Sequence, residues 1–474
     1  MFLTAILIYL GMLVAFSVWQ SRSTKTSDDF LVAGRSLPAR VLVFTLLATW
    51  IGSGSLFGGA GLGYRAGFAA LWQPAGAWAG ILLIYFLAPR VRRIAKYTLP
   101  DILQLRYGNA ARILGTLTIV IAYTTIAAYQ FRGGGRLLNL VAGIDVTQGA
   151  FITMMFCVAF TAMAGMMSVA YLDVGNGVMM LVGVGAAVVF LILNAGGPVP
   201  AFEALRPDQV ALFGTLDPWR DAGAIFLPTM LLLMGEANMY QKLFSAKDEG
   251  AAKRAVAGWI LVTIVVETLI ISVGVFGSTL FPNLTAGESE AIVLQVAVSG
   301  LPTVLGLMLV CGAGAIIVST ANSFLLAPAS ALMRDVYLPY VNPNATDRQV
   351  LFATRAMVVV LGVAGFTALG YFATILEMAL WAYTMIGAGL TPALLAAFLW
   401  PRVTRLGGVS SIVVGMGTTL AWEILARLRG GEGEALYLWG IPTIYPALVL
   451  AVVTLVAVSL MTPPPSEADR TAIK

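Results

Sequence analysis

Neutral oxygen atoms crowd one face of an apolar segment in the second half of the chain. The residues that carry them are spaced i, i+3, i+4 and i+7, which places them on one side of a helix. They are Ile316, Ser319, Thr320 and Ser323, with Asn322 beside them. Hydroxyl, amide and carbonyl oxygens are the ligands that hard cations take. Hydroxyls inside membranes also bond a carbonyl of their own helix or join neighbouring helices, so the spacing indicates either a cation site or a polar packing face.

A glycine-rich stretch in the first half of the chain, residues 48–63 (ATWIGSGSLFGGAGLG), lies within another apolar run. Its six glycines are interleaved with Ser53 and Ser55. Glycine in a helix interior is less favourable than alanine by about 1 kcal/mol. Irregular backbone at membrane depth is tolerated only where protein or a wet cavity surrounds it. The stretch therefore predicts a broken helix that lines a binding site, or else a packing face of small residues.

A second apolar run, over residues 222–244, is interrupted by Gly235, Glu236 and Asn238. Interrupted spans at matching positions of two halves are the best sequence indication of a secondary transporter's binding site. The two stretches therefore predict one site that is built from two broken helices.

Three more polar residues in apolar runs each have two interpretations. Asp173, at a membrane edge, is solvated or paired with a lysine, or else it holds an ion. Arg132 forms a structural pair with an acidic residue, or it contacts a solute. Gln73 is a polar residue at the outer end of its span, or it forms hydrogen bonds in a cavity. The sequence leaves each of these alternatives open.

The composition is that of a membrane protein. Of 474 residues, 59% are hydrophobic and 11% are charged, whereas soluble domains have about 25% charged residues. The chain has no histidine, which excludes histidine metal sites and histidine proton relays. Its two cysteines, Cys157 and Cys311, provide no disulfide framework. We find no nucleotide motif or catalytic constellation, so we expect neither an enzyme nor a nucleic-acid-binding protein.

Apolar runs of about 20 residues predict an all-α polytopic membrane protein with thirteen transmembrane helices. The runs cover residues 2–20, 41–63, 68–89, 111–141, 148–168, 173–195, 222–244, 255–280, 300–333, 350–370, 373–400, 408–427 and 442–462. Most of the 28 Lys and Arg residues fall in the loops on one side of these spans. By the positive-inside rule, the N-terminus is outside and the C-terminus is inside.

We expect one transmembrane domain over residues 1–462, followed by a cytoplasmic tail over 463–474. Spans 2–6 and spans 7–11 contain five helices each. An odd-numbered repeat inserts upside down, so this spacing predicts an inverted repeat. The first repeat would cover 41–195 and the second 222–400, with the remaining spans, 2–20, 408–427 and 442–462, at the periphery.

Five motifs, in order, resemble the sodium:solute symporter family, which includes sugar, proline, pantothenate, sialic acid, iodide and choline carriers. They are DDFLVAGRSLP before span 2, TLPDILQLRYG after span 3, the turn over 165–173, YQKLFSAKD after span 7 and STANSFLLAPASALMRDVY in span 9. The resemblance covers residues 1–460 and implies the LeuT-type inverted-repeat fold with five plus five helices.

The resemblance also implies a sodium site between the break in span 2 and span 9. The residues at the matching positions are Ala48, Ile51, Ile316, Ser319 and Thr320. Some members hold a second sodium, for which the matching residues here are Asp173, Asn322 and Ser323. Those members have two serines where this chain has Asn322 and Ser323.

Solute contacts in the family come from the loop after the span 2 break and from spans 3, 7 and 11. The residues that this implies are Ser53, Gly54, Ser55, Gln73, Thr229 and Leu232, to which we add Arg132. Span 7 is apolar here (LPTMLLLM), where sugar carriers have polar or aromatic residues, and this argues against a hexose. Arg132 facing the cavity would favour an organic anion or an amino acid, that is, a carboxylate.

The function implied is a symporter that imports a small organic solute by alternating access, with Na+ as the coupling ion. One alternative is a sodium-coupled carrier of a neutral sugar or vitamin. Another is a proton-coupled carrier on the same fold, whose proton would need one of the acidic residues Glu236, Glu267, Glu377 or Asp173. We expect a multi-pass protein of the plasma membrane, a bacterial inner membrane, that acts as a monomer and whose partners are its solute and the lipid bilayer.

Overall fold

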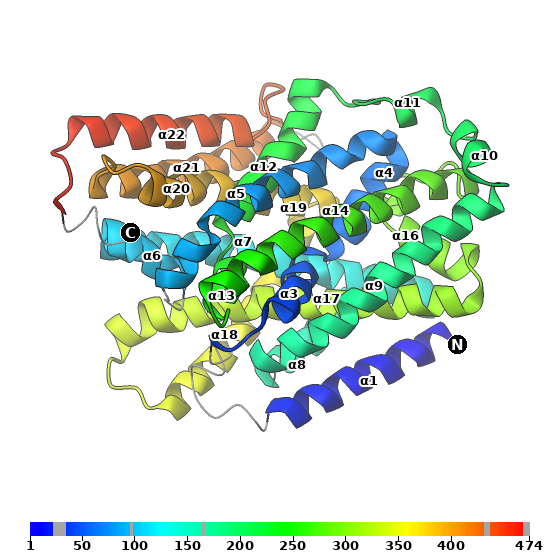
Figure 1. Cartoon of the computed structure of the whole chain (residues 1–474), viewed down its shortest axis with the longest axis horizontal. Coiled ribbons are helices and arrows are strands. Elements are labelled where there is room, and N and C mark those ends of the chain that lie inside the picture. The colour runs from blue at the N-terminus through cyan, green and yellow to red at the C-terminus, as the bar shows by residue number, and fades with distance from the viewer. Residues whose placement is uncertain (22–34, 95–97, 164–165, 431–436, 468–474) are drawn as a thin grey trace.

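Helices make up the regular structure of the chain. The computed structural model describes residues 1–21, 35–94, 98–163, 166–430 and 437–467. In these ranges most long helices run along the long axis of the molecule (Figure 1), and the extended structure consists of two isolated β-bridges. The all-α prediction is confirmed.

The first half of the chain forms the helices that carry the first predicted break. They are α1 (Phe2–Ser21), α3 (Ala39–Trp50), the π-helical turn η2 (Gly54–Gly59), α4 (Ala60–Ala66), η3 (Gly67–Leu71), α5 (Trp72–Ile94), α6 (Leu99–Tyr107), α7 (Asn109–Ala142), α8 (Val146–Met163), α9 (Met166–Asn194), α10 (Pro198–Glu203) and α11 (Pro207–Val210).

The second half carries the second predicted break. Its helices are η4 (Pro218–Ala222), α12 (Gly223–Gly235), α13 (Ala237–Phe244), α14 (Glu249–Leu280), α15 (Ala286–Ser289), α16 (Ile292–Gln295), η5 (Val296–Gly300), α17 (Thr303–Leu332), η6 (Met333–Val341), α18 (Asp347–Ala368), η7 (Leu369–Tyr371), α19 (Ile375–Gly389), α20 (Thr391–Leu399), α21 (Arg405–Leu428) and α22 (Ile444–Met461).

Eleven helical segments among the described residues are long and apolar enough to cross a membrane. Two shorter apolar helices, Phe2–Ala15 and Ala39–Trp50, lie where the first two spans are predicted. The chain is therefore a multi-pass membrane protein. The total of thirteen spans and the outside location of the N-terminus stay predictions.

Both helices that the sequence predicts to be broken are broken. α3 ends at Trp50, Ile51 is extended (φ −73°, ψ 109°), and helical structure continues in η2 from Gly54. α12 ends at Gly235, and Glu236 is extended (φ −77°, ψ 112°) before α13 begins. A helix that ends in this way leaves carbonyl groups of its last turn without an amide partner.

Two details differ from the sequence prediction. The span predicted over 373–400 is divided at Leu390 into α19 and α20. Pro392 follows near the start of α20, where a residue without an amide hydrogen is tolerated. The span predicted from residue 173 begins earlier, because α9 starts at Met166 and most of the turn predicted over 165–173 is helical.

Two predicted features extend beyond the described ranges. Residues 28–34 of the DDFLVAGRSLP motif lie outside them, and so do residues 468–474 of the predicted tail. What the sequence predicts for these residues therefore stays a prediction.

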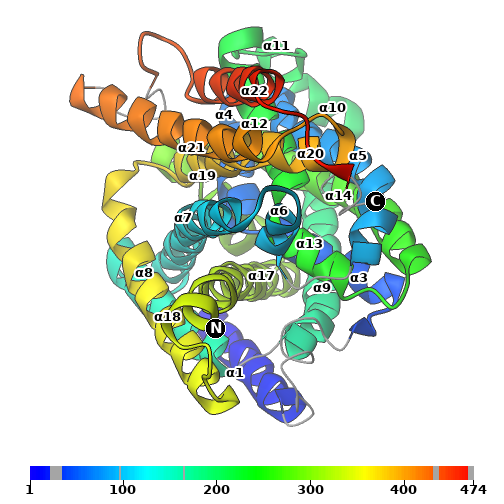
Figure 2. The same cartoon turned by 90° about the vertical axis from the view of Figure 1, so that its left-hand side faces the viewer.

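The broken helices are largely buried and pack against long helices of the bundle. α3 contacts α9 and α14, α17 contacts α7 and α9, and α12 contacts α5 and α19. Viewed along the long axis, α1, α18, α21 and α22 lie toward the rim (Figure 2). Gly274 lets α14 approach α4 closely, because a Cβ atom there would lie 2.1 Å from the backbone oxygen of Ala60.

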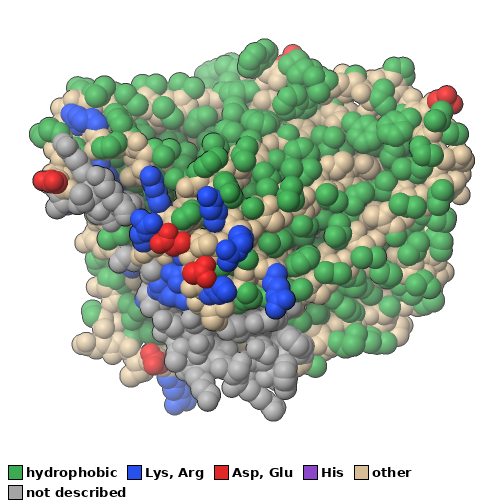
Figure 3. All heavy atoms as spheres, in the orientation of Figure 1, with side chains coloured by type: hydrophobic (Ala, Val, Ile, Leu, Met, Phe, Trp, Pro, Cys, Tyr) green, Lys and Arg blue, Asp and Glu red, His purple; other side chains and the backbone are tan. Residues whose placement is uncertain are grey.

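Apolar side chains are spread over the face seen in Figure 3, with few charged side chains away from one end, as a lipid-facing surface requires. Lys and Arg gather on this face toward one end of the long axis, around α13 and the start of α14. Arg93 pairs there with Glu249 at 3.0 Å, and Lys253 lies 5.0 Å from the ring centre of Tyr85. α22 ends toward this same end of the molecule.

Candidate ion and solute site

Two carbonyl groups freed by the break in α3 meet a hydroxyl group of α17. Thr320 Oγ1 donates to the carbonyl oxygen of Ala48 at 3.0 Å and to that of Ile51 at 3.1 Å. In an unbroken helix each of these carbonyls would accept an amide four residues ahead, but the extended backbone at Ile51 interrupts that pattern. Three of the five predicted sodium ligands therefore converge on one point.

The other two predicted ligands lie on the same buried face of α17. Ser319 is buried, and its hydroxyl donates to Oδ1 of Asp173 on α9. Ile316 is also buried, one helical turn before Thr320. Because the proton of Ser319 points toward Asp173, the lone pairs of its oxygen remain free to accept. The predicted ligands thus gather where α3, α9 and α17 meet.

Asp173 is fully buried and has a cationic neighbour. Its Oδ2 accepts a hydrogen bond from Thr45 at 2.5 Å and lies 3.8 Å from Nζ of Lys242. Lys242 in turn donates to the carbonyl oxygen of Thr45 at 2.6 Å and to the hydroxyl of Thr49. A buried charge is stable only when it is paired and hydrogen-bonded, and these groups satisfy one another.

The residues that the resemblance implies for a second sodium are less well assembled. Asn322 is buried and its Oδ1 has no hydrogen-bond partner among the described residues, while Ser323 is half-buried. The side chain that Asp173 bonds on α17 is Ser319 rather than either of these two. A sodium at Asp173 would share the carboxylate with the ammonium group of Lys242. Sequence reasoning missed Lys242, which lies near the end of the span predicted over 222–244 and is only 4% exposed.

The predicted solute residues that follow the break are held by neighbouring helices. The amide of Ser53 donates to Oε1 of Gln130 on α7 at 2.8 Å, and the hydroxyl of Ser55 donates to Glu267 on α14 at 2.7 Å. Gly54 has no room for a side chain, because a Cβ atom there would lie 2.9 Å from the hydroxyl of Tyr383. Sequence reasoning named Glu267 only as a possible proton carrier and did not name Gln130 or Tyr383, whose polarity within apolar runs was the one signal available.

The remaining residues predicted to contact the solute, in spans 3 and 7, have different surroundings. Gln73 packs against η2, where its Oε1 would lie 3.3 Å from a Cβ atom at Gly59. Thr229 is buried and donates to the carbonyl oxygen of Ile225 in its own helix at 2.6 Å. Leu232 is buried in the same helix, α12. Gln73 therefore lies beside the broken segment, whereas the hydroxyl of Thr229 is already used within α12.

Arg132 binds the turn between α18 and α19. Its guanidinium donates to the carbonyl oxygen of Phe372 at 2.8 Å and to that of Leu369, and its buried Nη1 has no partner within the described ranges. In the described part of the chain these acceptors are backbone carbonyls, so the acidic pair that was one alternative for Arg132 is not formed. Its contact with a solute stays a prediction.

Several buried polar atoms around the two breaks, and on the facing helix α14, lack a hydrogen-bond partner within the described residues. They are Ser53 Oγ, Gln130 Nε2, Glu236 Oε1, Asn238 Nδ2 and Thr263 Oγ1. Protein interiors leave few polar atoms unpaired, so such atoms mark places where a ligand or an ordered water completes the bonding. Both breaks are therefore lined by groups that are ready to bind a polar molecule.

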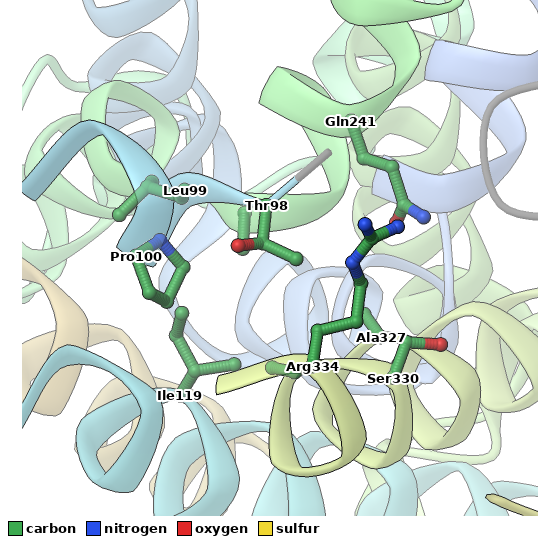
Figure 4. Close-up of a pocket in the computed structure, with 10 residues that line it drawn as sticks. Thr98, Leu99, Pro100, Ile119, Gln241, Ala327, Ser330 and Arg334 are labelled. Carbon is green, nitrogen blue, oxygen red and sulfur yellow. The ribbon is translucent and has the colours of Figure 1, made fainter. Parts of the chain in front are cut away.

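A narrow pocket lies between the ends of α6, α7, α13 and α17 (Figure 4). Thr98, Gln241, Ser330 and Arg334 are among the residues that line it, and Arg334 extends toward Gln241. The volume of about 10 Å³ has room for one water molecule. Nearby, Arg112 pairs with Asp335 at 2.6 Å and so joins α7 to η6. The helices therefore pack closely around this pocket.

Comparison with known proteins gives a consistent result over nearly the whole chain. The sequence profile of the sodium:solute symporter family matches residues 30–415. The osmoregulated proline transporter OpuE of Bacillus subtilis is 25% identical over 98% of this chain and 95% of its own length. The sodium/pantothenate symporter of Escherichia coli is 27% identical over 94% of this chain and 93% of its own length.

Solved structures share the fold. A substrate-bound, outward-open Na+-coupled sialic acid symporter superimposes with a TM-score of 0.78 at 14% identity, covering 98% of this chain and 99% of that one. Mhp1, a nucleobase-cation-symport-1 family transporter, superimposes with a TM-score of 0.58 at 14% identity, covering 94% and 99%. At these identities the likeness describes the backbone arrangement alone.

Proposed function

Because the chain belongs to the sodium:solute symporter family, we propose that it is a sodium-coupled symporter that imports a small organic solute by alternating access. The observation that carries the proposal is the meeting of Ala48 O, Ile51 O and Thr320 Oγ1 at the break in α3. Oxygen atoms of this kind suit a hard, weakly charged cation such as Na+. Ser319 and Ile316 complete the proposed ligand set.

The geometry supports a simple coupling mechanism. An ion held by Ala48, Ile51 and Thr320 links α3 to α17, and Thr320 must turn its proton away from the carbonyls to offer a lone pair. The solute segment from Ser53 to Ser55 follows directly on the same broken helix. Sodium therefore orders the segment that contacts the solute, and the solute in turn raises the affinity for sodium by the same factor.

We propose that one sodium ion is carried per cycle. The support is the distance of 3.8 Å between Asp173 and Lys242, since the protein's own ammonium group already balances this carboxylate. Asp173, Asn322 and Ser323 would hold a second ion only after Lys242 moves away.

For the solute we propose an amino acid or another small carboxylate. The support is that the curated relatives carry proline and pantothenate. The proposed contacts are Ser53, Gly54, Ser55, Gln73, Thr229, Leu232 and Arg132. Arg132 would reach a carboxylate through its free Nη1 while its other nitrogen holds the turn before α19.

The finer architecture is also a proposal. Thirteen spans with the N-terminus outside would place the end that is rich in Lys and Arg in the cytoplasm of a bacterium. Repeats over 41–195 and 222–400 are supported by the paired breaks at Ile51 and Glu236. A single copy would suffice, since all the proposed ligands lie in one chain.

Uptake into proteoliposomes tests the function directly. Purified protein is supplied with labelled proline or pantothenate under an inward sodium gradient, or under an inward proton gradient without sodium. Sodium-driven accumulation of either compound supports the proposal. Accumulation that follows the proton gradient alone would identify a proton-coupled carrier instead.

A further inference from the structure

Glu267 is a buried carboxylate that joins both sides of the break in α3. It lies in the middle of α14 and is 3% exposed. Its Oε1 accepts the indole N–H of Trp50 at 2.8 Å and the hydroxyl of Ser55 at 2.7 Å. Trp50 is the last residue of α3 and Ser55 lies in η2. The carboxylate is therefore fixed against the segment that we propose to contact the solute.

The charge of Glu267 is not balanced by a basic residue. Within the described part of the chain no ion pair includes it, and both of its hydrogen-bond donors are neutral. Three other buried acidic side chains among the described residues are paired with a base. These pairs are Asp173 with Lys242, Glu290 with Arg136 and Asp335 with Arg112, and the half-buried Glu377 pairs with Arg427.

One further buried acid, Glu236, also has no ion pair among the described residues, but it has a different source of stabilisation. It directly precedes α13 (Ala237–Phe244), and the amino end of a helix favours negative charge. Glu267 has no such support, because it lies midway along α14. An isolated carboxylate in a membrane interior is costly and is found where it meets a cation.

The groups around Glu267 are those that surround an organic cation. The rings of Trp50 and Tyr383 lie with their centres 6.0 Å apart, and the hydroxyls of Tyr383 and Tyr129 are 3.4 Å apart. Aromatic faces attract a positive charge on nitrogen. Thr263, one turn before Glu267 on α14, is fully buried, and its hydroxyl has no partner in the part of the chain that the structure describes. Together these side chains offer a negative charge, two aromatic rings and a spare hydroxyl.

We propose that Glu267 binds a positively charged nitrogen of the transported solute, so that the substrates are amines, namely amino acids or related organic cations. The proposal rests on the proposed function and deepens it by naming the group that is recognised. Sodium uses a different side of the break, since the carbonyls of Ala48 and Ile51 meet Thr320 on α17, whereas the side chain of Trp50 reaches α14.

Thermal unfolding of the purified full-length protein tests this inference. Sodium is first titrated alone, and then matched pairs of compounds are added at saturating sodium: proline and N-acetylproline, glycine and N-acetylglycine, and the remaining amino acids with their N-acetyl forms. We expect stabilisation from one or more amines and none from the acetylated partners. Stabilisation by an acetylated form equal to that of its amine, or by pantothenate but no amine, would overturn the inference.

Glu267→Gln separates solute recognition from sodium binding. Glutamine can still accept from Trp50 and Ser55, so the fold is preserved while the negative charge is lost. We expect the dissociation constant of the stabilising amine to rise at least about tenfold, as for a lost hydrogen bond to a charged group, with sodium affinity unchanged within about twofold. Glu377→Gln is the matched control, because its carboxylate pairs with Arg427 at 2.9 Å, and it should leave the affinity for the amine unchanged.

The outcomes distinguish this inference from the proposed function. If sodium alone neither stabilises the wild-type protein nor drives uptake, the proposed function fails. If sodium stabilises it but Glu267→Gln weakens sodium binding tenfold and spares the amine, Glu267 is an ion ligand and the inference fails. If Glu267→Gln does not fold, the comparison of amines with acetylated partners in the wild-type protein still decides the question.

Discussion

At the scale of single residues, the proposed ion site depends on one hydroxyl group. Thr320 bonds two carbonyls, one in the last turn of α3 and one directly after it, and it is 1% exposed. A threonine in a helix commonly bonds a carbonyl of its own preceding turn, as Thr354 does with Val350. Thr320 instead bonds another helix, and this is the arrangement that a cation can replace.

Thr320→Ala should weaken sodium binding. Loss of one ligand oxygen removes an interaction with a charged group, which corresponds to a rise of about tenfold in the sodium concentration for half-maximal uptake. The measurement is solute uptake in proteoliposomes as a function of external sodium. Thr354→Ala, in α18, is the control and should leave this concentration unchanged. An unaltered sodium dependence in Thr320→Ala would remove Thr320 from the ligand set.

Lys242→Met should leave the buried negative charge of Asp173 without its positive partner. Loss of one partner from a buried pair typically destabilises a protein by about 3–5 kcal/mol, so we expect a lower melting temperature that saturating sodium partly restores. The double variant with Asp173→Asn should recover stability without added sodium, because neither charge remains.

Direct binding of radioactive sodium should give one ion per wild-type protein. Two ions in the wild type would contradict the proposed stoichiometry.

At the scale of helices, glycines allow close contacts that hold the broken segment in place. Gly133 on α7 faces Ser53, and a Cβ atom at this position would lie 2.1 Å from its Oγ. Gly54 faces the hydroxyl of Tyr383 in the same way. α7 and α19 therefore approach the segment after the break closely.

Gly133→Ala should displace the segment after the break. The added methyl group meets Ser53, and overpacking of this kind costs typically about 1–3 kcal/mol. We expect a lower melting temperature and a weaker response of that temperature to solute. Gly417→Ala, at a position in α21 with no atom within 4 Å of the added carbon, should have neither effect. Equal behaviour of the two variants would show that the contact with Ser53 is unimportant.

Sequence reasoning recovered the breaks but not their surroundings. The glycines near Ser53 and the Gly235–Glu236 pair predicted both interruptions, because helix propensity is a local property. Asp173, Ser319 and Thr320 were also placed in the site, from helical spacing and family motifs. Lys242 and Glu267 were not, since the partner of a buried charge lies far away in the chain and only the packing of helices reveals it.

At the scale of the whole molecule, ion pairs join helices at opposite ends of the bundle. Arg112 binds Asp335 at 2.6 Å beside the narrow pocket. Arg136 binds Glu290 at 2.7 Å toward the other end of α7, and Glu290 also accepts the amide of Ile375 at the start of α19 at 2.7 Å. Alternating access requires each end to open in turn, so we expect these contacts to break in different states.

Asp335→Asn should favour opening of the end that contains the narrow pocket. The loss of its charge weakens the pair with Arg112, and a change of about 1.4 kcal/mol shifts a conformational equilibrium tenfold. In a protein with Cys157 and Cys311 replaced by alanine, a cysteine introduced by Ser330→Cys reports the opening. We expect its labelling by a polar maleimide to accelerate several-fold. Glu290→Gln, which weakens the opposite end, should not accelerate it.

The neutral ligands at the break of α3 have an electrical consequence. Carbonyl and hydroxyl oxygens do not cancel the charge of the ion they hold, and the Asp173–Lys242 pair beside them adds no net charge of its own. When a sodium ion enters with an amino acid of zero net charge, one positive charge crosses the membrane in each cycle. Each turnover then moves one elementary charge. An inside-negative voltage of 100 mV would therefore contribute about 2.3 kcal/mol to the free energy of solute uptake.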